Sequence, residues 1–71
     1  MQRFGEKLRY LRKQHGMTIK DLVRVIGYAT HSHISEMETG KKKPLLEFAI
    51  KVADLFNVTI NQLVRDELEI D

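Results

Sequence analysis

A cluster of polar side chains near the middle of the chain could carry the chemistry of this protein. The segment from Thr30 to Glu36 holds hydroxyl, imidazole and carboxylate groups between two apolar segments of helical periodicity. These groups give and accept hydrogen bonds, and histidines can also bind metals. However, His31 and His33 are two residues apart on a helix, so they point roughly 200° apart, and the chain has no Cys. Recognition by hydrogen bonding is therefore favoured, and we expect neither a metal nor a cofactor.

The same polar cluster is a poor candidate for catalysis. The available acid–base groups are His31, His33, Glu36 and Glu38. Catalysis needs such groups to converge in a pocket, beside a nucleophile or a metal. The sequence indicates no pocket for them, and no nucleophile or metal beside them, so we expect that the protein is not an enzyme.

Apolar spacing and capping residues predict three helices in the first forty residues. The first runs from about residue 2 to 15, and Thr18 and Thr30 cap the second and third. The helices end at three glycines, Gly16, Gly27 and Gly40. The apolar residues of these helices are Phe4, Leu8, Leu11, Leu22, Val23, Ile26, Ile34 and Met37.

The rest of the chain predicts two further helices and an acidic tail that extends the last helix or frays. Pro44 begins the fourth helix, because proline is tolerated in a first turn. Its apolar stripe consists of Leu46, Ala49, Ile50, Ala53 and Phe56. Thr59 and Gln62 form the capping-box pattern of a fifth helix, which carries Ile60, Leu63 and Val64. No segment alternates as a half-buried strand does, so residues 1–71 are expected to form one all-α domain, a compact five-helix bundle.

Charge is distributed unevenly along the chain. Residues 1–43 hold ten Lys or Arg against four Asp or Glu, whereas residues 44–71 hold two against six. This asymmetry is typical of a basic face directed at phosphate and an acidic end away from it, although an ordinary solvated surface would also explain it. No apolar run approaches the roughly 20 residues needed to cross a bilayer, and no signal peptide is apparent. We therefore expect a soluble, cytoplasmic protein with no membrane partner.

The segment from residue 16 to 64 resembles the Cro and lambda-repressor-like helix-turn-helix family, also called the Xre family. The positions that match its pattern are Gly16, Thr18, Leu22, Gly27, Ile34, Glu38, Gly40, Pro44, Leu46, Val52, Ala53, Leu55, Val58 and Leu63. In such domains the second helix of the motif enters the DNA major groove with its N-terminal end. The resemblance implies that residues 31 to 39 form this recognition helix.

The resemblance also implies which residues contact DNA. Base edges would be read by His31, Ser32 and Glu36, with His33 and Thr39 beside the backbone. Phosphates would be bound by the start of the second helix and by Lys41, Lys42 and Lys43, with Lys20 and Arg9 as lesser candidates. Simpler interpretations remain open: Ser32 could only cap the helix, Glu36 could be merely solvated, and the lysines could form a solubilising loop.

Two further features follow from the comparison with the family. The family implies a structural pair between Arg12 and Glu38, because an isolated carboxylate at that depth would be costly. The chain departs from the pattern at Ile19, where glutamine is usual, and at Leu45, where a capping hydroxyl is usual. The turn also holds one extra residue, which places Tyr28 either in the core or against the DNA backbone.

These observations predict a sequence-specific transcriptional regulator that binds a two-fold-related operator in double-stranded DNA as a homodimer. The dimer surface is expected in the last helix and tail, whose apolar residues exceed the needs of the core: Ile60, Val64, Leu68 and Ile70. An antitoxin-like or accessory module, which binds another protein through its acidic tail, is the alternative. Non-specific nucleic-acid binding is a second alternative, and it predicts no preferred site.

Overall fold

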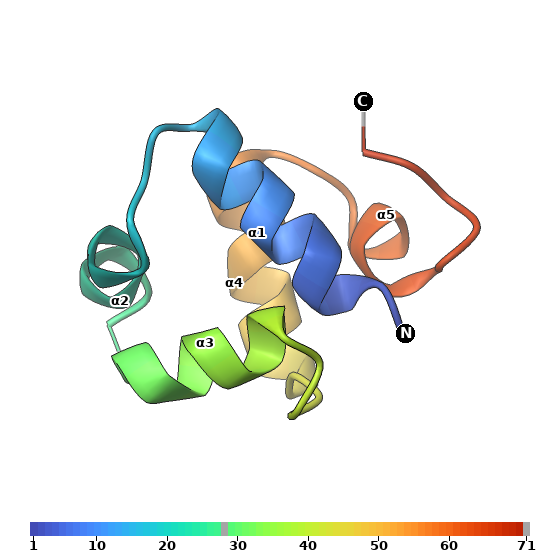
Figure 1. Ribbon diagram of the computed structural model, residues 1–71. Helices are drawn as coiled ribbons and strands as arrows, with labels where there is room; N and C mark the ends of the chain where they lie inside the picture. Colours follow the sequence, from blue (N-terminus) through green and yellow to red (C-terminus); the bar gives the residue numbers. More distant parts are fainter. Residues whose placement is uncertain (28, 71) are drawn as a thin grey trace.

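The structure is a computed structural model, and it describes residues 1–27 and 29–70. Five helices follow one another along the chain: α1 (Phe4–Gln14), α2 (Ile19–Ile26), α3 (His31–Glu38), α4 (Leu46–Phe56) and α5 (Ile60–Val64). The described residues contain no strand, which confirms the all-α prediction. In Figure 1, α1 crosses α4, with α2 and α3 on one side and α5 with the C-terminal tail on the other. Tyr28, for which two positions were predicted, lies outside the described residues.

Hydroxyl caps begin three of the helices, as the sequence predicts. The Asp21 amide donates to Thr18 Oγ1 at 3.1 Å, and the Thr18 amide donates to the Asp21 carboxylate at 2.9 Å. Thr30 Oγ1 accepts from the His33 amide at 3.1 Å at the start of α3. A second capping box, formed by Thr59 and Gln62, begins α5. These bonds satisfy amides that have no acceptor within the helix.

Gly40 ends α3 in a left-handed conformation, with φ of +83°. Its amide donates to the Met37 carbonyl, and the Lys41 amide donates to the Glu36 carbonyl. This pair of bonds is the Schellman motif. In this motif the residue after the C-cap adopts a left-handed conformation, which glycine takes without strain. Gly40 therefore turns the chain sharply, and the basic loop starts directly at the end of α3.

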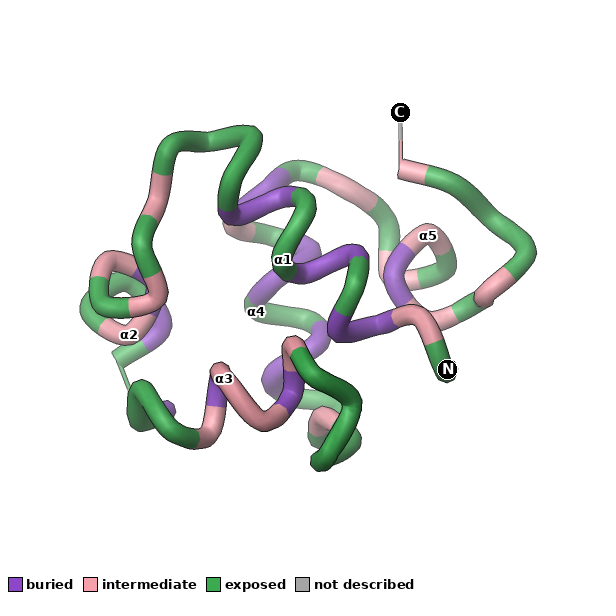
Figure 2. The backbone as a smooth tube through the Cα atoms, viewed as in Figure 1, coloured by how far each residue is buried: buried purple, intermediate pink, exposed green. Residues whose placement is uncertain are grey.

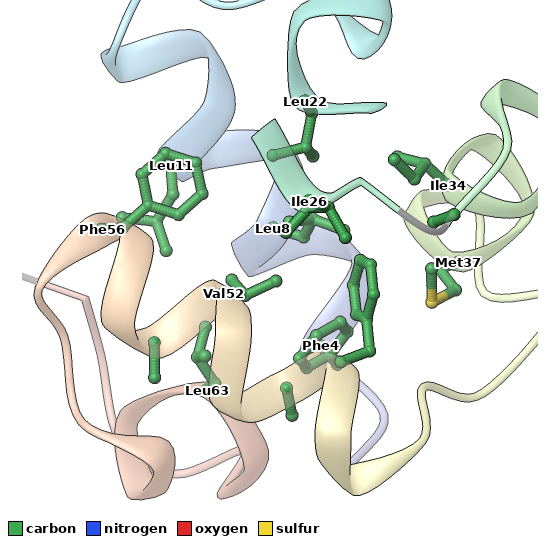
Figure 3. Packing of buried hydrophobic residues seen from close by; sticks show 14 residues of the cluster. Phe4, Leu8, Leu11, Leu22, Ile26, Ile34, Met37, Val52, Phe56 and Leu63 are labelled. Atoms are coloured by element: carbon green, nitrogen blue, oxygen red, sulfur yellow. The ribbon is translucent and has the colours of Figure 1, made fainter. Parts of the chain in front are cut away.

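The core joins all five helices. Figure 3 shows Phe4 and Leu8 of α1 beside Val52 of α4, with Leu63 of α5 and Met37 of α3 at its edges. The Phe4 and Phe48 rings meet edge to face with centroids 6.2 Å apart. At Gly5, an added Cβ would lie 2.1 Å from the Met37 carbonyl oxygen. The first turn of α1 therefore packs directly on the C-terminal end of α3 and supports the helix predicted to read DNA.

Helix α4 differs from its prediction in its start and in its buried face. It begins at Leu46 rather than Pro44, and its N-cap, Leu45, makes no side-chain hydrogen bond. The buried face consists of Phe48, Ala49, Val52, Ala53 and Phe56. Leu46 and Ile50, predicted for this face, are 68% and 43% exposed. Both stripes have helical spacing, and the packing of Phe48 on Phe4 selects the one that is buried.

A buried lysine joins α1 to the C-terminal part of the chain. Lys7 is only 2% exposed. Its ammonium group donates to three backbone carbonyls, those of Gln62 at 2.6 Å, Arg65 at 2.8 Å and Leu68 at 2.6 Å. An ammonium group has three donors, so its hydrogen-bonding capacity is fully used. Lys7 thus holds the end of α5, a helix of five residues, against α1.

Within the described residues, the acidic tail returns to the N-terminal end of α1 and does not extend α5. Asp66 accepts hydrogen bonds from the amides of Gln2 at 3.0 Å and Arg3 at 2.9 Å. Arg3 in turn pairs with Glu69, at 3.0 Å. The amide hydrogen bonds of Arg3 and Gln2 lower the pKa of Asp66 below its ordinary value. We call these contacts of Arg3, Lys7, Asp66 and Glu69 the tail clasp.

Candidate nucleic-acid interface

Helix α3 has one buried face and one polar face. Ile34 and Met37 are 0% and 1% exposed and anchor the helix to the core. The opposite side of the helix carries Ser32 and Glu36, exposed and half-buried respectively, and Figure 2 shows α3 at the edge of the molecule. Ile34 and Met37 attach one side of the helix to the core. The polar residues lie about half a turn away, so the helix presents hydrogen-bonding groups on the side that faces away from the core.

The structure gathers most of the predicted contact residues on this helix and the loop after it. The exposed members are His31, Ser32, Thr39, Lys41, Lys42 and Lys43, and the half-buried members are His33 and Glu36. Lys20 is exposed in the first turn of α2, and Arg9 is exposed on α1. The base-reading and phosphate-binding candidates of α3 and its loop therefore lie on two adjacent segments of the chain and are all exposed or half-buried.

Ser35 is a candidate that the sequence interpretation missed. It is half-buried on α3. Residues i, i+3, i+4 and i+7 of a helix share a face, so Ser35 lies on the same side as Ser32, Glu36 and Thr39. That spacing was available in the sequence, and it adds a hydroxyl to the polar face.

The basic loop folds back onto Glu36. The Glu36 carbonyl accepts from the amides of Lys41 and Lys42, at 2.9 and 3.3 Å, and from Thr39 Oγ1 at 3.2 Å. The Glu36 carboxylate also lies 3.8 Å from the Lys42 ammonium group. Glu36 therefore holds the loop through its backbone carbonyl and pairs with Lys42 through its carboxylate.

The start of α2 offers fewer amides for phosphate than the sequence suggested. The amides of Thr18 and Asp21 are used by the capping box, while those of Ile19 and Lys20 have no acceptor within the helix. The capping bonds of Thr18 lower the pKa of Asp21, so this carboxylate is charged at neutral pH. Lys20 supplies a positive charge beside it.

Arg12 and Glu38 form a two-point ion pair behind α3. Arg12 Nε lies 2.7 Å and Nη2 3.0 Å from the two carboxylate oxygens of Glu38, and the side chains are 10% and 5% exposed. Arg12 Nη1 also donates to the Met17 carbonyl at 2.9 Å. The hydrogen bond with Glu38 raises the pKa of Arg12. This pair ties α1 and the segment before α2 to the C-terminal end of α3, so it sets the position of the helix.

Among the described residues, no helix is long and apolar enough to span a membrane.

Comparison with known proteins gives the family of the chain. A helix-turn-helix family profile matches residues 8–63, a range that includes α2 and α3. No solved structure matches the chain.

Two curated relatives are similar over most of their own length. An uncharacterized HTH-type transcriptional regulator of Methanocaldococcus jannaschii is 37% identical over 57 residues, which are 80% of this chain and 85% of the relative. One of Archaeoglobus fulgidus is 35% identical over 57 residues, 80% of each chain. The chain therefore belongs to the helix-turn-helix family of DNA-binding transcriptional regulators, a family without enzymatic activity.

Proposed function

We propose that this chain is a single-domain, sequence-specific regulator that acts in the cytoplasm and binds a two-fold-related DNA operator as a homodimer. One observation carries the proposal: α3 presents Ser32, Glu36 and Thr39 on the side away from the core, and the loop directly after it holds three exposed lysines. A helix of this kind reads base edges, and the neighbouring lysines hold the phosphates beside the groove. The family membership supports DNA as the ligand.

The chemistry of the polar face suits base recognition. An imidazole donates to the acceptors on guanine, and a hydroxyl gives or accepts with most bases. A carboxylate accepts from the amino group of cytosine. We assign these roles to His31, Ser32 and Glu36, with His33 and Thr39 beside the backbone. Lys41, Lys42 and Lys43, with Lys20, bind phosphates.

The two groups of residues predict different effects of mutation. Replacing Lys41, Lys42 and Lys43 together with alanine removes up to three positive charges from the phosphates, so the dependence of log K on log[salt] should flatten by about 0.9 for each phosphate that is no longer neutralised. Affinity for every duplex should fall together. Ser32→Ala should instead change which base pair is preferred and leave the salt slope nearly unchanged.

Fluorescence anisotropy with labelled duplexes at several salt concentrations measures both effects. The assignment is contradicted if the lysine variant changes site preference but keeps the wild-type salt slope. Lys13→Ala, which removes one exposed charge from α1, shows the effect of losing a single positive charge outside the loop.

A homodimer would give the selectivity that one small module lacks, because two recognition helices about 34 Å apart read successive major grooves.

The predicted dimer surface needs revision. Ile60, Val64 and Ile70 pack half-buried against the core of their own chain, so they are not surplus. The two most exposed large apolar side chains follow the basic loop: Leu45 and Leu46 are 72% and 68% exposed, with Ile50 at 43% one turn further along α4. Val25, Tyr10 and Met1, at 53%, 48% and 47%, lie on other parts of the chain, and Leu68 in the tail is 36% exposed.

We therefore place the dimer contact at the start of α4. Leu46→Glu should weaken self-association and lower affinity for a two-half-site duplex more than for a single half-site. Leu68→Glu is the matched control in the tail. Sedimentation velocity with and without DNA measures the oligomer, and a Leu46→Glu protein that dimerises as the wild type does would exclude this surface.

In the alternative of a protein-binding module, the acidic tail is the part that faces a partner. Asp66 and Glu69 are instead engaged by the amides and guanidinium of the N-terminal segment. We therefore favour DNA as the main ligand.

A further inference from the structure

We propose that the ion pair between Glu36 and Lys42 acts as a selectivity pair. It weakens binding to DNA that has no base amino group to donate a hydrogen bond to Glu36. The proposal rests on the assignment of α3 and its loop to DNA. The Glu36 carboxylate is paired with the Lys42 ammonium group in the free protein and on non-specific DNA. At the correct site, a base amino group in the major groove donates a hydrogen bond to this carboxylate. Lys42 is then released and binds a phosphate.

The geometry links the two roles in one residue. Lys42 Nζ lies 3.8 Å from Glu36 Oε1, and the two side chains are 58% and 41% exposed. The amides of Lys41 and Lys42 bind the Glu36 carbonyl, so the loop cannot move far from the carboxylate. Among the described residues, Lys42 is the only one of the three loop lysines with an ion-pair partner.

Charge explains why non-specific DNA is disfavoured. A duplex without a suitable donor brings its phosphates towards a carboxylate that no base hydrogen-bonds, and the repulsion between them is unfavourable. Lys42 must then leave its partner to reach a phosphate, with no compensating bond for Glu36. Discrimination of this kind depends on an interaction that penalises the wrong ligand as much as on one that favours the right ligand.

A base amino group reverses this balance. Cytosine N4 is the amino group that a carboxylate accepts from in the major groove. Once Glu36 accepts from it, Lys42 leaves the carboxylate and binds a phosphate, so a correct base adds one further ionic interaction. The salt slope for the correct site should therefore exceed the slope for random DNA by about 0.9.

The pair is a feature of binding rather than of fold stability. The Lys42 and Glu36 side chains are 58% and 41% exposed, and ion pairs that solvent reaches to this extent contribute little to folding. Glu36→Gln keeps the backbone carbonyl that holds the loop and removes only the charge. The variant should therefore fold as the wild type does, which thermal unfolding can verify.

The test compares wild type, Glu36→Gln, Lys42→Ala and the double variant. Each is titrated with a random-sequence duplex and with the duplex selected from a random pool, at several salt concentrations. Glu36→Gln should bind the random duplex about two- to fivefold more tightly, with a salt slope steeper by about 0.9. It should bind the selected duplex about tenfold more weakly, because the charged acceptor for the base amino group is removed.

The double variant supplies the decisive comparison. Lys42→Ala should weaken binding to random DNA less in the wild type than in the Glu36→Gln background. Lys43→Ala should weaken it equally in both, because Lys43 has no carboxylate partner among the described residues. Glu47→Gln, which removes an exposed charge from α4, controls for net charge.

Two outcomes overturn the proposal. If Glu36→Gln and Glu47→Gln bind random DNA with the same affinity and slope, or if Lys42→Ala has the same effect in both backgrounds, Glu36 does not restrain Lys42. A wild type that prefers its selected duplex in that experiment leaves the proposed function intact. A wild type that binds all duplexes equally overturns both.

Discussion

Two carboxylates on the same helix lie in different surroundings. Glu38 is 5% exposed at its side chain and lies against the guanidinium of Arg12. Glu36 is 41% exposed at its side chain and faces the basic loop. Position on the helix decides this difference: two residues correspond to roughly 200° of rotation, so one carboxylate faces the core and the other faces solvent.

This contrast predicts different stabilities for two alanine variants. Glu38→Ala leaves the Arg12 charge with only the Met17 carbonyl in a nearly buried site, and breaking such a pair costs about 3 kcal/mol. Glu36→Ala removes only an exposed side chain and should change stability by less than about 0.5 kcal/mol. Urea unfolding of both variants measures the difference, and equal midpoints would contradict the structural role of the pair.

Local signals in the sequence predicted the starts of α2, α3 and α5 well. Thr18, Thr30 and Thr59 each cap a helix through a hydroxyl, and such caps depend on residues only three positions away. The buried face of α4 was predicted poorly, because Leu46–Phe56 is apolar on more than one side. Which side is buried depends on Phe4, more than forty residues earlier in the chain, and no local pattern contains that information.

Helix α5 depends on a residue from another element. With five residues, it is too short to be stable alone. Lys7→Met would leave the carbonyls of Gln62, Arg65 and Leu68 without their donor, and we expect a destabilisation of about 2 kcal/mol. Thermal unfolding followed by circular dichroism measures it, with the exposed Lys13→Met as control. A Lys7→Met protein as stable as the control would show that water replaces the ammonium group without cost.

The tail clasp joins the C-terminal part of the chain to the N-terminal end of α1. Asp66 meets the first residues of the chain across 63 positions of sequence, an interaction that neither periodicity nor family resemblance indicated. It also changes the meaning of the acidic end. The charge of this end stabilises the N-terminal end of α1 and pairs with Arg3, while the lysines after α3 stay exposed.

The clasp predicts a specific dependence of stability on pH. The pKa of Asp66 is lowered in the folded protein, so its contribution is complete above the unfolded pKa of about 3.9 and disappears as the pH falls through the lower folded value. Asp66→Asn should therefore be less stable than the wild type at pH 7, and the difference should shrink below about pH 4. Urea unfolding at pH 7 and pH 2.5 measures this, with the exposed Asp54→Asn as control. A difference that is independent of pH would show that the Asp66 charge is not involved.

We propose that α3 reads DNA sequence in a paired, two-fold arrangement, and selection of bound duplexes from a random pool tests this claim. We predict an enriched sequence with two inverted half-sites whose centres are about one helical turn, or 10 base pairs, apart. A pool that yields no enriched sequence after repeated selection, while the protein still binds DNA, would contradict the claim.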